Sequence, residues 1–308
     1  SVVTATALSL ALGILFAFFG NTYLNFQVPP SRRNRALFYF VVISLFSGGL
    51  QWSVVKFLDE LILNYEQGRL IISGCLFMIA YFLHRRFTFR DFKRVGVAIY
   101  ANGVEDLRGI HERIGQYPDF IHVDIVDPSF APDTLETNTF RMETVRALWP
   151  NKEIHTHIMS KTPSKWLIEV LPYSDIVFVH WECDEPLDNL IMSIRSKNVR
   201  AGVALTMETT PEQAANTLKN IDSVLLLTIP NPGKSGQKFD IEGLERIEQL
   251  TKMPLREQLR ICVDGGVNEK IVSLLKVEDV VSGSSVLNHA DPKHQILRLQ
   301  TAGRYELV

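Results

Sequence analysis

The chain has 308 residues, of which 46% are hydrophobic and 21% charged, a composition that excludes a disordered tail, a collagen-like fibre and a disulfide-rich scaffold. The three cysteines are too scattered for a disulfide framework or a CxxC metal knuckle, so we expect a reducing compartment. The formal net charge is −2, but residues 1–94 carry ten Lys and Arg against four Asp and Glu. This split predicts two parts in different surroundings, the basic part beside anionic lipid, and it argues against nucleic-acid binding.

Three apolar runs without a charged residue dominate the first 94 residues, at 2–19, 36–55 and 70–83. The first two approach the ~20 residues that cross a bilayer, although buried helices of a soluble core are the alternative for each run. Basic residues follow the first and third runs, and such loops stay cytoplasmic. We therefore expect about three spans in the plasma (inner) membrane, with the remainder of the chain in the cytoplasm. The first residue is Ser, which predicts a processed segment that lacks one N-terminal span.

Two segments of this part share a pattern: FFGNTYLNF at 18–26 and YFLHRRFTF at 81–89. Each has an aromatic pair, then polar residues, then an apolar–polar–Phe ending, although an aromatic belt at the lipid interface would place such residues similarly. With these motifs, residues 1–94 resemble the GtrA-like family of small four-span membrane proteins. The resemblance implies that the first span is missing and that the domain moves polyprenyl-phosphate-linked sugars across the lipid bilayer.

From residue 95 onward, short β-branched runs alternate with amphipathic helical stretches such as 104–117 and 241–250. This alternation is typical of parallel α/β folds, and eight units predict a (β/α)₈ TIM barrel over 95–308. A doubly wound open sheet is the alternative, but no Gly-rich turn follows the first strand. The expected strands cover 95–100, 120–125, 153–158, 176–180, 200–205, 223–228, 260–263 and 279–282.

Ionisable side chains gather where three of these strands end. His122 and Asp124 lie two residues apart and so point to the same side of one strand, while His157 and Asp264 end two others. Each residue alone is more often a satisfied core group or a helix cap. Inward-facing His and Asp are costly unless they pair or bind a metal, and two imidazoles with two carboxylates suit a borderline divalent cation. The four together predict a metal site at the barrel mouth.

Glycine-rich loops follow the last three strands. In barrels of this kind the loops after strands seven and eight bind phosphate through backbone N–H groups, and the loop after strand six has the composition of a flexible lid. Each glycine cluster alone is an ordinary turn. We expect substrate and phosphate contacts from Gly233, Lys234, Ser235, Gly236, Gly265, Gly266, Gly283 and Ser284.

In their order along residues 95–299, these segments resemble the ribulose-phosphate 3-epimerase family. The shared motifs lie at 122–127, 157–159, 178–182, 202–205, 231–239, 263–267 and 282–284. The resemblance implies a divalent ion (Zn, Fe, Mn or Co) on His122, Asp124, His157 and Asp264. It also implies an enediolate intermediate against Met159, with Asp124 and Asp264 removing and returning a proton on opposite faces. Such enzymes often associate, so the resemblance implies a homo-oligomer.

Some substrate-holding positions differ from the family pattern. Ala98 and Ala101 stand where the family has serines, and Lys234 replaces part of a glycine- and phenylalanine-rich lid. Lys234 adds a cation that suits a larger or more anionic substrate.

The sequence leaves two functional hypotheses. One is a membrane-anchored, metal-dependent ketose-phosphate epimerase coupled to lipid-linked sugar transport. The alternative is a lipid-linked sugar transporter whose barrel binds sugar phosphate without catalysis.

Overall fold

The computed structural model describes residues 2–25, 33–59, 65–84, 93–101, 104–132, 141–256 and 258–302. The chain divides into two compact units, Ser1–Phe92 and Lys93–Val308. Each unit has its own set of packed elements, and the three apolar runs of the sequence lie in the first.

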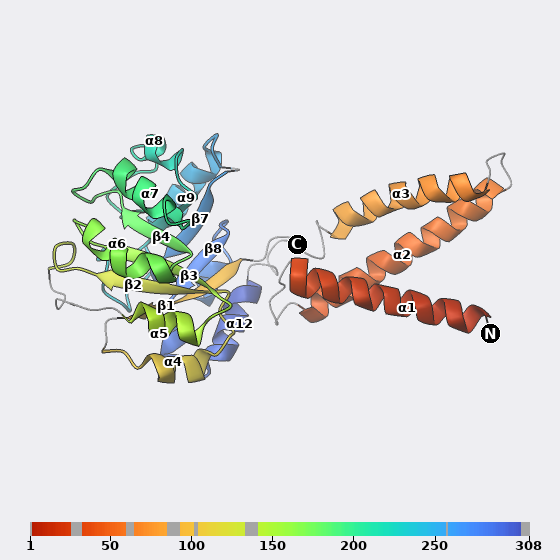
Figure 1. The fold of residues 1–308 in the computed structure, drawn as a ribbon, viewed down its shortest axis with the longest axis horizontal. Coiled ribbons are helices and arrows are strands. Elements are labelled where there is room, and N and C mark those ends of the chain that lie inside the picture. The colour runs from red at the N-terminus through yellow and green to blue at the C-terminus, as the bar shows by residue number, and fades with distance from the viewer. Residues whose placement is uncertain are drawn as a thin grey trace. The chain divides into compact units, whose positions relative to one another are not determined.

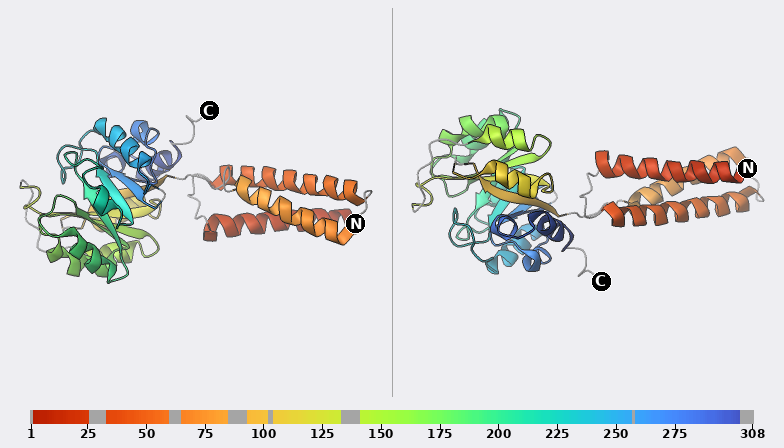
Figure 2. Two further views of the ribbon diagram at one scale, coloured as in Figure 1. Left: turned by 90° about the horizontal axis from the view of Figure 1, so that it is seen from above. Right: turned by 90° about the horizontal axis from the view of Figure 1, so that it is seen from below.

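The first unit consists of three long helices that run side by side (Figures 1 and 2). They are α1 (Val2–Gly20), which continues into the π-helical turn η1 (Asn21–Asn25), α2 (Arg33–Asp59) and α3 (Tyr65–Leu83). Aromatic contacts join them, because the rings of Phe18 and Phe40 lie 5.6 Å apart and Phe40 stacks on His84 at 4.4 Å. Large apolar side chains such as Phe16 and Phe77 remain exposed.

The predicted spans therefore form helices at the expected places. Within the part of this unit that the structure describes, however, no helix combines the length and the apolar character needed to cross a membrane. The three spans stay a prediction.

The second unit is a closed barrel of eight parallel strands, which confirms the TIM barrel and rejects the open sheet (Figure 1). The last strand pairs with the first, so neither edge is left open. The strands are β1 (Arg94–Tyr100), β2 (Phe120–Val126), β3 (Glu153–Met159), β4 (Ile176–His180), β5 (Arg200–Leu205), β6 (Ser223–Leu227), β7 (Arg260–Asp264) and β8 (Asp279–Ser282).

Helices cover the outside of this barrel (Figure 2). They are α4 (Leu107–Ile114), α5 (Met142–Leu148), α6 (Ser164–Val170) with the short η4 (Leu171–Tyr173), α7 (Leu187–Arg195), α8 (Ala215–Leu218), α9 (Glu242–Lys252), α10 (Glu269–Val272), α11 (Ser284–Leu287) and α12 (Pro292–Ala302).

The first of these helices, α4, is shorter than the predicted stretch 104–117. Asp106 begins it by accepting a hydrogen bond from the Gly109 amide, and Gly115 ends it with a backbone φ of 56°. An N-cap and a left-handed glycine set the two ends of a helix independently of its apolar periodicity.

Two hydrophobic layers hold the barrel together. The larger lies between strands and helices and contains residues such as Trp149 and Ile158. The smaller fills the barrel interior around Phe120 and Phe178. Because side chains alternate along a strand, the inward row of β2 passes from Phe120 to His122 and then to Asp124. The aromatic rings thus close the lower barrel, and polar groups follow toward the carboxyl ends of the strands, where active sites of this fold lie.

Gly96 on β1 provides a test of this packing. A Cβ at Gly96 would lie 2.1 Å from Cε2 of Phe120, and that ring cannot retreat because it stacks on His155 at 3.9 Å and lies under Arg94. We expect Gly96→Ala to lower the free energy of unfolding by about 1–3 kcal/mol, the usual cost of overpacking. Urea unfolding followed by tryptophan fluorescence measures it. Gly283→Ala is the control, since its Cβ would make an ordinary 3.4 Å contact with Ala98, and equal midpoints for both variants would contradict the prediction.

Candidate metal centre and catalytic pocket

The four predicted metal ligands come together at the end of the barrel that is formed by the carboxyl ends of the strands. His122 and Asp124 lie on β2, His157 on β3 and Asp264 at the end of β7. One ligand atom from each lies within 4.8 Å of all the others. Register explains part of this convergence, because Asp124 is paired with His157 on the neighbouring strand. Barrel closure places the carboxyl end of β7 at the same mouth.

Asp124 is the centre of this cluster. Its Oδ1 lies 3.1 Å from Nδ1 of His157 and 3.3 Å from Nε2 of His122. The His122 contact lacks hydrogen-bond geometry, and neither ring nitrogen of this fully buried side chain has a hydrogen-bond partner among the described residues. A buried, unpaired polar group costs about 1–3 kcal/mol. A cation that accepts the Nε2 lone pair removes this cost, so the donor set fits a divalent metal.

The pKa values of Asp124 and Asp264 are shifted in opposite directions. Burial alone would raise the pKa of Asp124, but the contacts from His122 and His157 outweigh it and hold that pKa below its usual range. Burial, followed by the charge of Asp124, raises the pKa of Asp264 to about 7. Burial also lowers the pKa of His157 to about 4, which keeps its ring neutral at pH 7. Two carboxyl groups whose pKa values are pushed apart can act as base and acid in one reaction.

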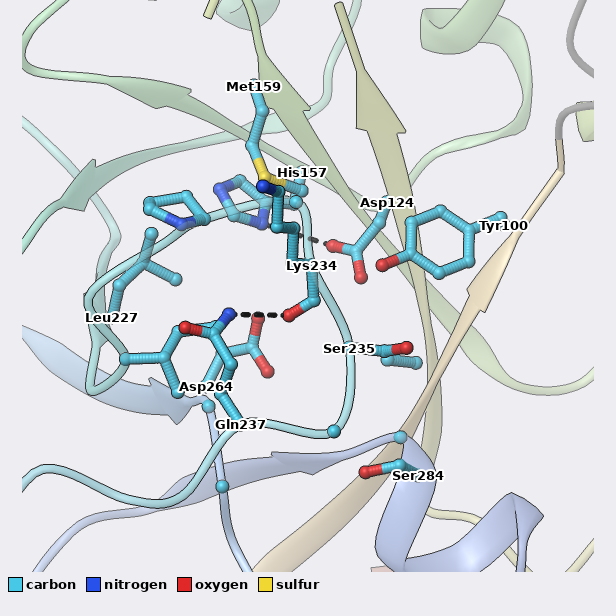
Figure 3. Close-up of a pocket in the computed structure, with 18 of the residues that line it drawn as sticks. Tyr100, Asp124, His157, Met159, Leu227, Lys234, Ser235, Gln237, Asp264 and Ser284 are labelled. Atoms are coloured by element: carbon cyan, nitrogen blue, oxygen red, sulfur yellow. Dashed lines mark hydrogen bonds and ion pairs between the residues drawn. The ribbon is translucent and has the colours of Figure 1, made fainter. Parts of the chain in front are cut away.

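A cavity of about 200 Å³ opens above the cluster. Figure 3 shows Asp124 and Asp264 on different walls of it, with Met159 and Leu227 supplying apolar surface. The nine residues expected to contact substrate or phosphate all line it: Met159, Gly233, Lys234, Ser235, Gly236, Gly265, Gly266, Gly283 and Ser284. The cavity therefore joins the cluster to the glycine-rich loops.

The loop after β7 requires its two glycines. Gly265 and Gly266 have φ values of 115° and 66°, and a Cβ at Gly266 would lie 2.1 Å from the backbone nitrogen of Phe239. Thr228 on the neighbouring segment donates its hydroxyl to the carbonyl oxygens of Asp264 and Gly265 at 2.9 and 2.7 Å. The backbone that follows Asp264 is thereby fixed at the cavity wall.

The loop after β6 is closed by hydrogen bonds that its composition does not indicate. Gln237 donates hydrogen bonds to the carbonyl oxygens of Asn231 and Lys234 at 2.6 and 2.7 Å, and its own side-chain oxygen accepts from the Asn231 amide at 3.1 Å (Figure 3). Gly233 and Gly236 adopt φ values of 82° and 79°. One glutamine side chain thus closes the loop on itself, which a count of glycines does not reveal.

Sequence reasoning missed four polar residues near the site. Tyr100 and Glu105 line the cavity, and the Glu105 carboxylate accepts a hydrogen bond from the Tyr100 amide at 2.7 Å. Burial and nearby carboxylates raise the pKa of Tyr100, so its hydroxyl stays a donor. His180 and Glu182 lie behind His157. The signal for this second pair was present as a His-x-Glu spacing that begins on the last residue of a strand, with no role assigned.

Two family models match separate parts of the chain. The model of the ribulose-phosphate 3-epimerase family matches residues 96–287, and that of the GtrA/DPMS transmembrane domain matches residues 1–89. The predicted fusion of these two families is confirmed. Curated relatives include ribulose-phosphate 3-epimerases of Bacillus subtilis (31% identical, covering 59% of this chain and 86% of the relative) and Helicobacter pylori (30%, 59% and 85%).

Solved structures similar to the barrel include 3-hexulose-6-phosphate synthase from Salmonella typhimurium, with a TM-score of 0.53 and 16% identity. A ligand complex of KGPDC from Streptococcus mutans has a TM-score of 0.52 and 15% identity. Each alignment covers 68% of this chain, with 98% of the first structure and 96% of the second. At such identities the likeness shows the barrel fold alone.

Proposed function

Because the chain belongs to the ribulose-phosphate 3-epimerase family, we propose that its barrel is a divalent-metal-dependent epimerase of a ketose phosphate. The observation that carries the proposal is the cluster of His122, Asp124, His157 and Asp264, in which two carboxyl groups of opposite pKa shift share one cavity. An epimerase must remove a proton from one face of a carbon and return one to the other face. Two carboxyl groups on different walls supply both operations.

In the proposed reaction the ionised Asp124 takes the proton from the carbon next to the carbonyl, and Asp264 delivers a proton to the opposite face. The roles exchange in the reverse direction. A divalent cation on the four ligands would stabilise the negative charge that develops on the substrate oxygens. Met159 and Leu227 give the intermediate an apolar contact, which limits the access of water to it.

Deuterium exchange tests this function. The full chain in detergent is incubated in D₂O with ribulose phosphate and with ketohexose phosphates. Proton NMR follows the hydrogen on C3, the carbon next to the carbonyl whose configuration is inverted. We expect deuterium at that carbon together with the epimeric product for at least one of these substrates. Binding of a sugar phosphate to the metal-loaded chain without exchange would contradict the epimerase proposal.

We further propose that the loops after β7 and β8 bind the phosphate and that Lys234 adds to its binding. Lys234 is exposed at the cavity, and a charge-assisted hydrogen bond in such a position is weakened by solvent. We expect Lys234→Gln to raise KM about five- to tenfold with little change in kcat. Lys238→Gln is the matched control, because this neighbouring lysine does not line the cavity. Equal KM values for the two variants would reject the role.

The match of residues 1–89 to the GtrA/DPMS transmembrane domain supports an integral membrane protein, and we propose that it handles a polyprenyl-phosphate-linked sugar beside a cytoplasmic barrel. A sugar already joined to a prenyl phosphate is an acetal without a free carbonyl, so its neighbouring proton is not acidic enough for enediolate chemistry. The barrel therefore acts on a precursor rather than on the lipid-linked sugar itself. Because the two parts belong to one chain, the product of one part is present at a higher local concentration near the other part.

The altered lid favours one alternative, a transporter whose barrel binds sugar phosphate without turnover. Lys234 and Ser235 occupy positions at the cavity where the family pattern has a different lid. This alternative predicts that the metal-free chain binds sugar phosphate as tightly as the metal-loaded chain, whereas the epimerase predicts tighter binding with metal. Isothermal titration of both forms with ribulose phosphate separates them.

A further inference from the structure

Tyr100 faces the cavity but has no part in the proposed reaction. It is the last residue of β1, and Ala98 lies two residues before it on the same face of the strand. Both residues line the cavity. Figure 3 shows the Tyr100 ring beside Asp124, with its hydroxyl turned toward the cavity. The first strand therefore presents one hydroxyl group, above a methyl group, to the occupant of the cavity.

The backbone of Tyr100 is fixed, whereas its hydroxyl is open. The amide donates a hydrogen bond to the Glu105 carboxylate at 2.7 Å, and the strand register places Tyr100 opposite Asp124 on β2. Within the described part of the chain, the hydroxyl has no hydrogen-bond partner. Since a tyrosine hydroxyl that is removed from solvent usually finds a partner, this one is available to a bound molecule.

The order of the strands around the mouth indicates which part of a substrate the hydroxyl meets. β1 lies between β8 and β2. The loop after β8 begins with Gly283 and Ser284, which belong to the proposed phosphate site, whereas β2 carries Asp124, which is proposed to act on the reacting carbon. A Cβ at Gly283 would lie 3.4 Å from Cβ of Ala98, so the phosphate loop and β1 form one continuous wall.

A ketose phosphate that reaches from the carboxyl groups to the phosphate loops therefore passes the end of β1. In Figure 3 Tyr100 and Ser284 lie on the same side of the cavity. The part of the substrate beside this wall is the chain between the reacting carbon and the phosphate. In a ketopentose phosphate that chain is C4, which carries a hydroxyl group.

We propose that Tyr100 is a specificity-determining residue that donates a hydrogen bond to the C4 hydroxyl of the ketose phosphate. A phenol is protonated at pH 7 and can donate one hydrogen bond. A site that bonds to a substrate hydroxyl discriminates against analogues that lack it, because its own polar group is then left without a partner. The inference rests on the proposed function for the position of the substrate, and it names a contact that selects that substrate.

A different role would be a direct action of Tyr100 on Asp124. Oδ1 of Asp124 already lies close to His157 and His122, and the structure shows no hydrogen bond between the Tyr100 hydroxyl and this carboxylate. If the hydroxyl nevertheless acted through Asp124, its loss would affect every substrate equally. Dependence on the C4 hydroxyl therefore distinguishes the two roles.

The test compares two substrates in the Co²⁺-loaded full chain in detergent. They are ribulose phosphate and its analogue with hydrogen in place of the C4 hydroxyl. Isothermal titration measures the binding of each, and deuterium exchange at C3 measures turnover. Loss of one hydrogen bond in Tyr100→Phe should lower the affinity and kcat/KM for ribulose phosphate about three- to tenfold. The values for the analogue should stay within twofold, because it has no hydroxyl to lose.

Tyr117→Phe is the matched control. Tyr117 lies between α4 and β2, packs against the barrel core and does not line the cavity, so its variant should leave all four values unchanged. Tyr100→Phe should keep the Co²⁺ affinity and the unfolding midpoint of the unaltered chain, because Tyr100 is not one of the four candidate ligands.

Two results would overturn the inference while leaving the epimerase proposal intact. One is an equal loss with both substrates in Tyr100→Phe, and the other is a loss of less than twofold with ribulose phosphate. If the binding loss is selective but no chain exchanges deuterium, Tyr100 keeps its role and the proposed turnover is rejected. If the unaltered Co²⁺-loaded chain binds neither substrate, the proposed function and this inference are both overturned.

Discussion

Replacing Asp264 with Asn is expected to reduce epimerisation by about 10²- to 10⁴-fold in both directions, the range that general acid–base catalysis contributes. The amide has nearly the shape of the carboxyl group but cannot exchange a proton with the reacting carbon. The rate of conversion between ribulose phosphate and its C3 epimer, measured from each side with the metal content matched, gives the effect.

Deuterium exchange in the same variant distinguishes the proton transfers on the two faces of the reacting carbon. Asp124 remains on its own wall of the cavity, so the epimer whose proton faces Asp124 should still exchange without inversion, while the other epimer should not exchange at all. Glu105→Gln neutralises a third carboxylate of the same cavity and should change the rate less than about tenfold. Loss of exchange with both epimers at full metal occupancy would contradict the two-face arrangement.

Removal of the metal is expected to have an effect of similar size. The cation is proposed to stabilise the charge on the substrate oxygens by several kcal/mol, so stripping it should lower the exchange rate at least about a hundredfold. The full chain is treated with a chelator, dialysed and assayed with ribulose phosphate in D₂O. Addition of Co²⁺, Mn²⁺ or Zn²⁺ should restore exchange.

Mg²⁺ serves as the comparison ion. It prefers six oxygen ligands in an octahedron, whereas two of the four candidate ligands here are imidazoles. We expect Mg²⁺ to restore much less exchange than a borderline ion at the same concentration. Full activity in the stripped chain, or equal recovery with every divalent ion, would argue against the proposed centre.

Much of the barrel could be predicted from the sequence because strand periodicity and barrel closure are strong constraints. The alternation that turns Phe120, His122 and Asp124 inward is visible in the sequence, and the parallel register then pairs Asp124 with His157. Once eight strands close, the carboxyl end of β7 meets the same mouth. The approach of four ligands therefore follows from local pattern and topology together.

Other features depend on single side-chain contacts that no periodicity encodes. The predicted lid carries internal hydrogen bonds, because Gln237 bonds back to Asn231 and Lys234. His180 meets His157 because the register of β3 and β4 places Phe178 opposite His157 and His180 lies two residues further along the same face. Such contacts between side chains of different strands become visible only in the folded barrel.

The first unit shows a different limit. Apolar runs predicted the positions of α1, α2 and α3, and the family match to residues 1–89 supports a membrane domain. Whether each helix spans a bilayer also depends on the surrounding lipid. Neither the sequence pattern nor the helix geometry describes that lipid. The membrane topology is therefore a prediction that accessibility labelling of single cysteines can test.

Metal stoichiometry tests the central claim most directly. The stripped full chain is reconstituted with Co²⁺, freed of excess ion and analysed for bound metal, alongside the single variants His122→Gln and His157→Gln. One ion per chain in the unaltered protein and much less in both variants is the predicted result. A chain that retains no Co²⁺, or variants that retain a full equivalent, would contradict a metal centre built from these four side chains.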